Sequence, residues 1–288
     1  MKILLTGCTG QLGRELKRSL ASLGELVACD RGQLDLAKPD ALRDAVRAIA
    51  PAVIVNAAAY TAVDKAEAEP AMADAINATA PGILADEARR LGALLIHYST
   101  DYVFDGAKRA PYTEDDNPAP LSAYGRSKRA GELAIAAAGS RHLILRTSWA
   151  YGLHGANFMK TMLRLARERS ELCVVGDQIG APTWTRHLAD VTALVIARRD
   201  IPGGLYHLAA AGETSWHGYA EAIFAEARVV GLLERSPLVH RITSADYPLP
   251  AARPANSRLD CSRFRRDFGL ALPDWRIGLI DCLADARF

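Results

Sequence analysis

Residues 2–13 read Lys2-Ile-Leu-Leu-Thr-Gly7-Cys-Thr-Gly10-Gln-Leu-Gly13, and the rest of the chain is organised around them. The apolar run predicts a buried strand, and the periodicity of residues 14–23 predicts a helix after the glycines. A strand, a Gly-rich turn and a helix make the first half of a dinucleotide-binding βαβ unit. Glycine is needed because a Cβ would hold a pyrophosphate away from the backbone, and the helix N-terminus offers free N–H groups to the phosphates. The segment therefore predicts a nucleotide site at Gly7, Gly10 and Gly13.

The spacing of these glycines is GxxGxxG rather than GxGxxG, and ordinary tight turns also contain such glycines. The surrounding sequence favours the nucleotide site. A second apolar run, residues 25–29, ends at Asp30, about 20 residues after the glycines, where an acid can bind the hydroxyls of the adenosine ribose. The sequence has no GxxxxGK[ST] motif, which argues against a phosphate-transferring P-loop.

The composition argues against several classes of protein. The chain has 288 residues, a formal net charge of +2 and 50% hydrophobic residues, so neither nucleic acid nor a membrane surface is indicated as a partner. No apolar run reaches the roughly 18 residues of a membrane span, and no export signal is recognisable. The cysteines form no CxxC pair and are Cys8, Cys29, Cys173, Cys261 and Cys282. Scattered thiols in apolar runs are typical of a reducing compartment, so we expect a cytoplasmic protein.

Apolar runs alternate with helical patterns through the first 150 residues. Further strands are predicted at 53–55, 94–98 and 142–146, and helices at 39–50, at 70–91 and from Tyr124. This alternation predicts an α/β fold with a doubly wound parallel sheet of the Rossmann type. The small residues 56–59 that follow the 53–55 strand fit either a ligand lying close to the strand end or tight packing there.

The pattern loosens after residue 150. Helices are predicted at 157–169, 187–198 and 216–230, a strand at 204–209 and loops at 241–259. We therefore predict a dinucleotide-binding domain over residues 1–150 and a smaller, mainly substrate-binding region over residues 151–288. We expect residues 184–210 to return to the first sheet, so that the two regions interleave.

Tyr124 and Lys128 lie four residues apart, on one face of the predicted helix. Such a pair is common on protein surfaces, but a cation also lowers the pKa of a neighbouring phenol from its usual value near 10. Thr100 ends a predicted strand at the edge where a ligand would bind. A hydroxyl that orients a carbonyl oxygen, a phenol that gives it a proton and an ammonium that tunes the phenol suit a carbonyl reduction, with the hydride supplied by a nicotinamide. His97, inside an apolar run, is interpreted as a core histidine.

These features together resemble the extended short-chain dehydrogenase/reductase superfamily. More narrowly, several segments are similar to those of the dTDP-4-dehydrorhamnose reductase family. The segments are Asn56-Ala-Ala-Ala-Tyr-Thr-Ala-Val-Asp-Lys-Ala-Glu67, Ser99-Thr-Asp-Tyr-Val-Phe-Asp-Gly106, Arg146-Thr-Ser-Trp-Ala-Tyr-Gly152, Gly180-Ala-Pro-Thr183 and Arg253-Pro-Ala-Asn-Ser257. The resemblance implies NAD(P)H-dependent reduction of the C4 ketone of dTDP-4-dehydro-L-rhamnose to dTDP-L-rhamnose, an activated sugar for bacterial surface polysaccharide.

The resemblance also implies a role for individual residues. On the cofactor it places Gly7, Gly10, Gln11, Leu12 and Gly13 at the pyrophosphate, Asp30 at the ribose, Asp35 and Leu36 at the adenine end, and Ala57, Ala58 and Ala59 along its length. Tyr124 and Lys128 contact the cofactor as well as serving catalysis. On the sugar side it places Thr100, Asp101 and Trp149. Tyr102 is expected at the pocket wall because it lies beside Thr100, and Arg253, close to Pro254 and Asn256, is expected as a diphosphate contact or pocket lid.

Two departures from related families refine this expectation. Sugar-nucleotide dehydratases carry an acidic pair after the threonine, whereas here Tyr102 follows Asp101, which disfavours elimination of water. Some reductases of the family bind a divalent ion such as Mg²⁺ through glutamates at a dimer interface. Glu15 fits one position, but Arg186 stands where the second glutamate is expected, and a cation opposes metal binding. Both the metal and a homodimer built on it are therefore in doubt.

The choice between NADH and NADPH stays open at this point. Asp30 repels a 2′-phosphate and favours NADH, whereas Arg31 could pair with that phosphate and favours NADPH. The family that this chain resembles often accepts both, so the resemblance implies that both cofactors are used. Two other functions remain alternatives. One is a sugar-nucleotide epimerase or dehydratase, which returns the hydride to its substrate. The other is a regulatory subunit that binds a dinucleotide and a protein partner without turnover.

Overall fold

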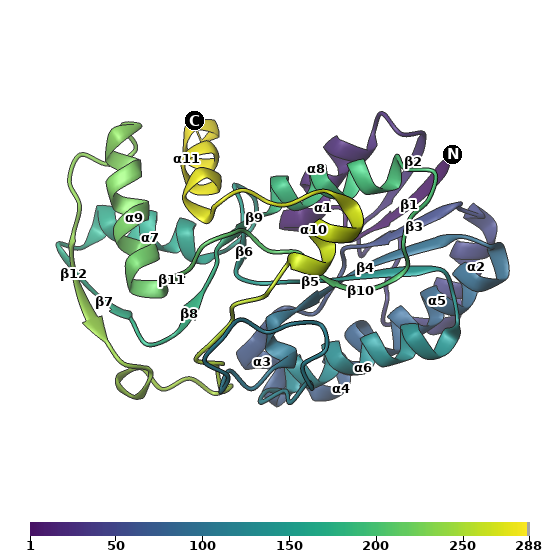
Figure 1. The fold of residues 1–288 in the computed structure, drawn as a ribbon, viewed down its shortest axis with the longest axis horizontal. Coiled ribbons are helices and arrows are strands. Elements are labelled where there is room, and N and C mark those ends of the chain that lie inside the picture. Colours follow the sequence, from purple (N-terminus) through teal and green to yellow (C-terminus); the bar gives the residue numbers. More distant parts are fainter. Residues whose placement is uncertain (287–288) are drawn as a thin grey trace.

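Six parallel strands form the central sheet of the computed structural model, which describes residues 1–286 (Figure 1). The order across the sheet is β2-β1-β3-β4-β5-β10. These strands are β1 (Lys2–Thr6), β2 (Glu25–Cys29), β3 (Val53–Asn56), β4 (Leu94–Thr100), β5 (His142–Thr147) and β10 (Gly204–His207). The order reverses between β1 and β3, and parallel sheets of this kind bind ligands at such a point, beyond the carboxyl ends of the strands. The doubly wound α/β class is confirmed.

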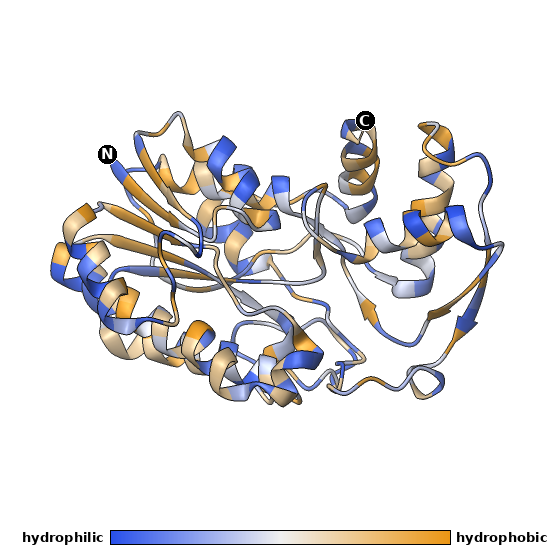
Figure 2. Cartoon of the chain, turned by 180° about the vertical axis from the view of Figure 1, so that it is seen from behind, coloured by the Kyte–Doolittle hydropathy of each residue, from blue (hydrophilic) through white to orange (hydrophobic). Residues whose placement is uncertain are grey.

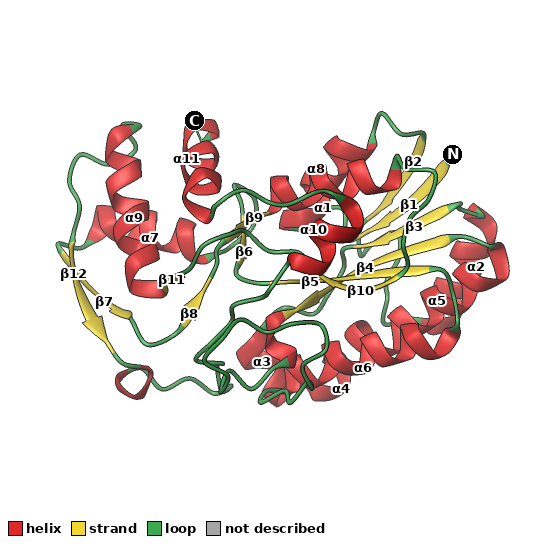
Figure 3. Cartoon of the chain, in the orientation of Figure 1, coloured by secondary structure: helices red, strands yellow, loops and turns green. Residues whose placement is uncertain are grey.

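Helices cover both faces of the sheet because alternate strand residues point to opposite sides. Ile3, Leu5 and Ile96 pack with α1 (Gln11–Leu20) and α8 (Thr185–Ile196). Leu4 and Leu95 pack on the other face with the helices α2 (Pro39–Ile49), α5 (Ala80–Leu91) and α6 (Ala123–Ala138). Figure 3 shows the two helical layers on either side of the yellow strands. Strands apolar on both faces are what a covered parallel sheet requires.

The helix predicted over residues 70–91 is interrupted by a π-helical turn. The structure has α4 (Pro70–Asp74), then the π turn η1 (Ala75–Thr79), then α5. Asn77, inside this turn, is fully buried, accepts a hydrogen bond from Tyr60 N at 2.8 Å, and donates to Tyr60 O and to Ser127 Oγ, each at 3.0 Å. The turn therefore connects the chain after β3 to the first half of α6.

A smaller layer of structure lies beside the sheet (Figure 1). Its core forms between α7 (Phe158–Glu168), α9 (Trp216–Val229) and α11 (Trp275–Asp285). The parallel strand pair β7 (Glu171–Val175) and β12 (Leu238–Ile242) was not foreseen from the sequence. The helix α8 packs against α1, and β10 pairs with β5, so residues 185–207 lie with the sheet. The division into regions at residue 150 stays a prediction.

Short elements complete residues 1–286. They are α3 (Val63–Ala68), the 3₁₀ turns η2 (Asp101–Val103) and η3 (Ser244–Asp246), β6 (Ala150–Tyr151), β8 (Ile179–Gly180), β9 (Thr183–Trp184), β11 (Thr214–Ser215) and α10 (Ser262–Phe268). Apolar residues concentrate in the central strands, whereas the helices mix apolar and polar positions (Figure 2). None of the helices within residues 1–286 combines the length and the apolar character that a bilayer crossing requires.

Candidate active site

The glycine-rich turn between β1 and α1 can pack this tightly against the neighbouring backbone only because side chains are missing. Gly7 has a φ of +69°, and a Cβ there would lie 2.7 Å from Ala58 N. A Cβ on Gly13 would lie 2.0 Å from Gly7 O. Gly10 is the N-cap of α1, and the first turn of α1 carries no acidic residue. The free backbone N–H groups of that turn, from Gln11 onward, have no competing carboxylate in the turn, so they suit an anion such as the pyrophosphate of a dinucleotide.

Asp30 follows β2 and shapes the turn in which it stands. Its Oδ1 accepts hydrogen bonds from Gly32 N and Gln33 N, at 2.9 and 3.0 Å. Arg31 is exposed and lies 3.9 Å from Asp35 Oδ1, which in turn accepts from Ala37 N. A carboxylate has acceptor capacity beyond these bonds, so Asp30 can still receive a ribose hydroxyl.

The other residues predicted along the cofactor differ in exposure. Leu36 is buried in the apolar cluster beneath α2, so packing accounts for it as well as a ligand contact would. Ala57, Ala58 and Ala59 are partly exposed beside the glycine turn. Their small size is what allows the close approach of Ala58 to Gly7.

Gln11 links the cofactor turn to the smaller layer. Asn157 Nδ2 donates to Gln11 Oε1 at 2.7 Å, and Gln11 Nε2 lies 3.5 Å from Ala156 O. Asn157 is also the N-cap of α7, where its side chain accepts from Lys160 N. A displacement of the glycine turn would therefore also move the N-terminus of α7, through the Gln11–Asn157 hydrogen bond.

Thr100 and Tyr124 meet at the carboxyl edge of the sheet. Thr100 is the last residue of β4, and α6, whose N-cap is Ser122, brings Tyr124 beside it. Burial raises the pKa of Tyr124 to about 12, a hydrogen bond with Thr100 opposes the rise, and Asp101 adds to it. The phenol therefore holds its proton at neutral pH, as a proton donor must. The expectation that the pKa of Tyr124 is lowered is wrong for the chain by itself, because loss of solvent outweighs any favourable charge.

Lys128 stands one turn after Tyr124 and is 2% exposed. Its Nζ donates to Tyr98 O at 2.7 Å and lies 3.1 Å from His97 Nε2. Burial lowers the pKa of Lys128 to about 8, although Glu132 favours the charged form. His97 is buried, as expected of a core histidine, but it is also a direct partner of Lys128, which sequence reasoning missed. A histidine among the apolar residues of β4 was the available signal.

Glycines bring α6 close to the neighbouring backbone. A Cβ on Gly125 would lie 2.2 Å from Tyr102 O, and one on Gly131 would lie 2.1 Å from Asn77 O. The approach at Gly125 places the rings of Tyr102 and Tyr124 edge to face, with centroids 5.5 Å apart. Neither close approach was foreseen, although a glycine inside a helix is a signal for one.

Asp101 follows Thr100 and is buried. Thr100 Oγ1 donates to Asp101 Oδ1 at 3.2 Å and accepts from Tyr102 N. Burial raises the pKa of Asp101 to about 7, and hydrogen bonds from Ser257 and Thr100 oppose this rise. Asp101 can thus be protonated near neutral pH, and its charge bears on Tyr124.

Trp149 follows β5 in a strained conformation, with a φ of +46°. Its ring stacks on Trp216 with centroids 3.6 Å apart, and a Cβ on Gly180 would lie 2.6 Å from its indole. Trp216 is held in turn by Gln178, whose Oε1 accepts from the indole nitrogen at 3.1 Å. Left-handed backbone at a non-glycine residue is maintained only where its surroundings demand it, often at a binding site.

Arg253 is paired within the chain. Its Nη2 donates to Asp64 Oδ2 at 2.7 Å and its Nη1 to Ala251 O at 2.8 Å. The segment after it packs on the loop that follows η2, because a Cβ on Gly106 would lie 2.5 Å from Ala255 N. The charge of Arg253 also acts on Tyr102, so the structure brings this arginine to the predicted sugar side. Its role towards a diphosphate stays a prediction.

The residues at the expected metal position do not fit a divalent cation. Arg186 Nε lies 3.1 Å from Glu15 Oε2, and Arg186 also pairs with Asp285. Arg18 reaches both Glu15 and Asp190. Within residues 1–286 no group of three or more His, Cys, Asp and Glu side chains could hold a metal ion. Two guanidinium groups thus already compensate these carboxylates.

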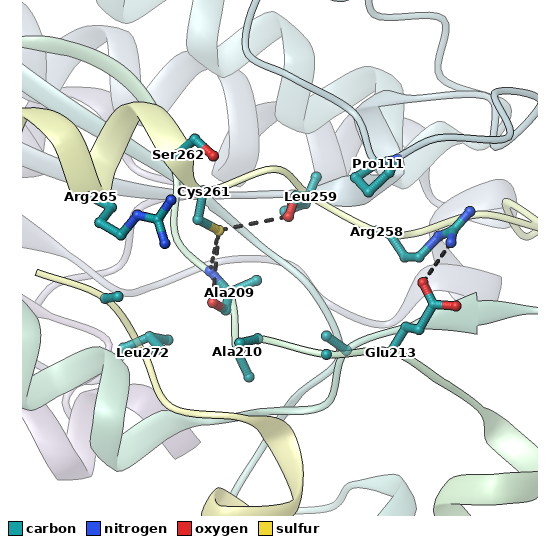
Figure 4. A pocket seen from close by; sticks show the side chains of 14 residues that line it. Pro111, Ala209, Ala210, Glu213, Arg258, Leu259, Cys261, Ser262, Arg265 and Leu272 are labelled. Atoms are coloured by element: carbon teal, nitrogen blue, oxygen red, sulfur yellow. Dashed lines mark hydrogen bonds and ion pairs between the residues drawn. The ribbon is translucent and has the colours of Figure 1, made fainter.

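A cavity of about 380 Å³ lies beyond the end of β10, away from the predicted site residues (Figure 4). Cys261 points into it and exchanges hydrogen bonds with the backbone of Ala209, while Arg258 pairs with Glu213 at its rim. Burial raises the pKa of Cys261 to about 12, so this thiol is not a nucleophile at neutral pH.

Comparison with known proteins gives a consistent result over the whole chain. The model of the family described as "RmlD substrate binding domain" matches residues 1–288. A dTDP-4-dehydrorhamnose reductase of Burkholderia thailandensis is 50% identical over 295 residues, covering 99% of each chain. A crystal structure of a dTDP-4-dehydrorhamnose reductase from Clostridium acetobutylicum has a TM-score of 0.94, 37% identity and full coverage of both chains. One from Bacillus anthracis, in complex with NADP, has a TM-score of 0.93, 36% identity and 99% coverage of both chains.

Proposed function

Because this chain belongs to the RmlD substrate-binding-domain family, we propose that it is a dTDP-4-dehydrorhamnose reductase. The proposed reaction reduces the C4 ketone of dTDP-4-dehydro-L-rhamnose to dTDP-L-rhamnose with NADPH or NADH. The observation that carries it is the meeting of Thr100 and Tyr124 at the carboxyl edge of a sheet whose glycine turn suits a pyrophosphate. Full-length similarity to named reductases supports the same assignment.

The roles of the residues follow from their chemistry. When bound, the nicotinamide supplies the hydride to C4. The Thr100 hydroxyl orients the ketone oxygen, and Tyr124 gives it a proton. After this proton transfer, a charged Lys128 is proposed to stabilise the Tyr124 phenolate, because an opposite charge favours the ionised form. Asp101, Tyr102, Trp149 and Arg253 are proposed to line the sugar side.

The test is turnover of the 4-keto sugar by purified protein, followed as loss of reduced cofactor. We expect Tyr124→Phe and Lys128→Met to lose nearly all turnover while keeping the circular dichroism spectrum of the parent. Variants with parental rates would refute the assignment. Separate assays with NADPH and NADH would show whether both are accepted, as the opposed charges of Asp30 and Arg31 suggest.

The same assay separates the reductase from its rivals. A reductase oxidises one equivalent of added cofactor for each ketone reduced. An epimerase or dehydratase would return the hydride and leave a bound cofactor unchanged, and a regulatory subunit would bind a dinucleotide without turnover.

Two further properties belong to this proposal. A cytoplasmic location agrees with cysteines that are all free, as in a reducing compartment. If the protein is a homodimer, the Arg186–Glu15 pair argues against an interface held by a shared divalent ion. Sedimentation with and without Mg²⁺ would measure both the oligomeric state and its dependence on metal.

A further inference from the structure

Three buried polar side chains on neighbouring strands, Thr6, Asn56 and His97, form a row of hydrogen-bonding contacts that ends at Lys128. The strand register pairs Thr6 with Asn56 and Asn56 with His97. Thr6 Oγ1 lies 2.6 Å from Asn56 Oδ1, and Asn56 Nδ2 lies 3.0 Å from His97 Nδ1. His97 Nε2 lies 3.1 Å from Lys128 Nζ. None of the four side chains is more than 2% exposed, and burying polar groups is unfavourable unless each is hydrogen-bonded.

The donors and acceptors of this row depend on the charge of Lys128. A neutral imidazole has one N–H and one acceptor nitrogen. Because Asn56 Nδ2 donates to Nδ1, the imidazole proton must lie on Nε2, which faces Lys128. An ammonium has three donors and no acceptor, so it cannot receive this proton. A neutral amine can, and it still donates to Tyr98 O.

When Lys128 is charged, each hydrogen bond along this row of side chains must run in the opposite direction. Nζ then donates to His97 Nε2, and the imidazole proton lies on Nδ1 instead. The amide of Asn56 must turn so that Oδ1 accepts this proton and Nδ2 donates to Thr6. The two arrangements have the same number of hydrogen bonds and differ by one proton, which Nζ carries in the second.

We propose that His97, held by Asn56, is a positioning residue that couples the charge of Lys128 to the orientation of the Asn56 amide. The proposal deepens the reductase function above and rests on it. Lys128 has to be charged when Tyr124 becomes a phenolate. The row satisfies both charge states of a lysine that water does not reach, so Lys128 can gain or lose its proton without leaving a buried polar group unpaired.

The neighbouring charged groups do not by themselves fix the charge of Lys128. Glu132 favours a charged Lys128 but is already paired with Arg146 at 2.7 Å and with Arg129 at 2.9 Å. Burial and the nearby Lys128 hold the pKa of His97 well below its usual value. His97 therefore changes tautomer rather than charge.

Two other titratable groups stand at the end of this row. Tyr124 lies on α6 one turn before Lys128, and Asp101 lies beside Thr100. The charge of Asp101 acts on Tyr124, and burial keeps the Tyr124 phenol protonated at neutral pH. The pKa of Asp101 is about 7, so this carboxyl has largely lost its proton before Lys128 does. We therefore assign the fall of kcat/KM above pH 8, the basic limb of the pH profile, to Lys128, whose pKa is about 8.

Two substitutions should move this limb in opposite directions. In Asn56→Asp the carboxylate only accepts, so the imidazole proton stays on Nδ1 and Nε2 accepts from an ammonium. The basic limb of kcat/KM should move up by about one pH unit, a tenfold change in the ratio of charged to neutral lysine. In His97→Leu the ammonium loses its acceptor, and the limb should move down by about as much.

Controls separate this effect from simple loss of packing. His97→Gln can present either an oxygen or an N–H to Lys128, so it should restore the limb towards the parental pH. His207 is also fully buried, but it lies against Arg146 and Tyr112 O. His207→Gln should therefore leave the limb in place. If Asn56→Asp and a folded His97 variant shift the limb in the same direction, or leave it unchanged, the proposal is wrong.

A second measurement does not depend on turnover. Titration of ¹³Cε-labelled lysine by NMR, with Lys128→Met identifying the signal, reports the charge of Lys128 in the free protein. The Lys128 titration should shift in the same opposite directions in Asn56→Asp and His97→Leu. If turnover is absent in the parent but these shifts occur, the reductase function fails and the coupling stands. If turnover is normal and the shifts are absent, only the coupling fails.

Discussion

Gly125→Ala should damage catalysis far more than folding. A Cβ at this position would lie 2.2 Å from Tyr102 O, whereas ordinary contact begins at 3.4 Å. The helix α6 and the η2 turn must therefore separate by about 1.2 Å. The atom in the way is a backbone oxygen, so no flexible side chain can move aside. Tyr124 is adjacent to the substituted residue and would move relative to Thr100.

The expected loss can be estimated from that displacement. A misplacement of about 1 Å can reduce activity by about a hundredfold, so we expect kcat/KM for the 4-keto sugar to fall by about that factor. Inserting a methyl group into a packed contact destabilises a protein by about 1–3 kcal/mol. Most domains remain folded after a loss of this size. The assays are steady-state turnover with NADPH and urea unfolding.

Gly139→Ala is the matched control in the same helix. Gly139 caps the far end of α6 with a φ of +64°, and a Cβ there would have no atom within 4 Å. We expect about 1 kcal/mol of destabilisation from backbone strain and no loss of kcat/KM. The reasoning is refuted if folded Gly125→Ala retains kcat/KM within threefold of the parent, or if Gly139→Ala loses as much activity as Gly125→Ala.

Two further predictions concern charge. Burial raises the pKa of Asp101 from 3.8 to about 7, so the folded protein binds this proton more tightly than the unfolded chain does. The free energy of unfolding therefore falls as the pH rises from about 4 to about 7, and it levels off above that. Asp101→Asn should thus gain up to about 4 kcal/mol over the parent at pH 8 and much less at pH 4; equal gains in urea unfolding at both pH values would contradict this. Because Arg186 and Arg18 already pair with Glu15, EDTA treatment should leave turnover within twofold of the untreated protein. Loss of activity that Mg²⁺ restores would show instead that a metal is bound.

Local patterns were sufficient for the order and type of most large elements. Alternating apolar runs and helical periodicity identified the strands of the sheet, including β10, and the spacing of Gly7, Gly10 and Gly13 identified the turn before α1. These features depend on neighbours within a few residues, so they can be recognised without the fold. The pair β7 and β12 was missed because each is short and its partner is distant in the chain.

The π turn within residues 70–91 is a feature that local sequence patterns could not predict. An α-helix and a π turn have nearly the same periodicity over so few residues. The extra residue is accommodated through Asn77, whose partners Tyr60 and Ser127 are 17 and 50 positions away. Hydrogen bonds between distant segments thus selected a conformation that helical propensity alone does not distinguish.

The sequence by itself determined the succession of strands and helices, the glycine turn and the types of group, hydroxyl, phenol and amine, available for a reduction. Only the tertiary structure decided their electrostatic state. It buries Tyr124 and raises the pKa of its phenol, and it sets His97 between Asn56 and Lys128. Desolvation and cross-strand hydrogen bonding depend on which segments pack together, and that packing is a property of the whole fold.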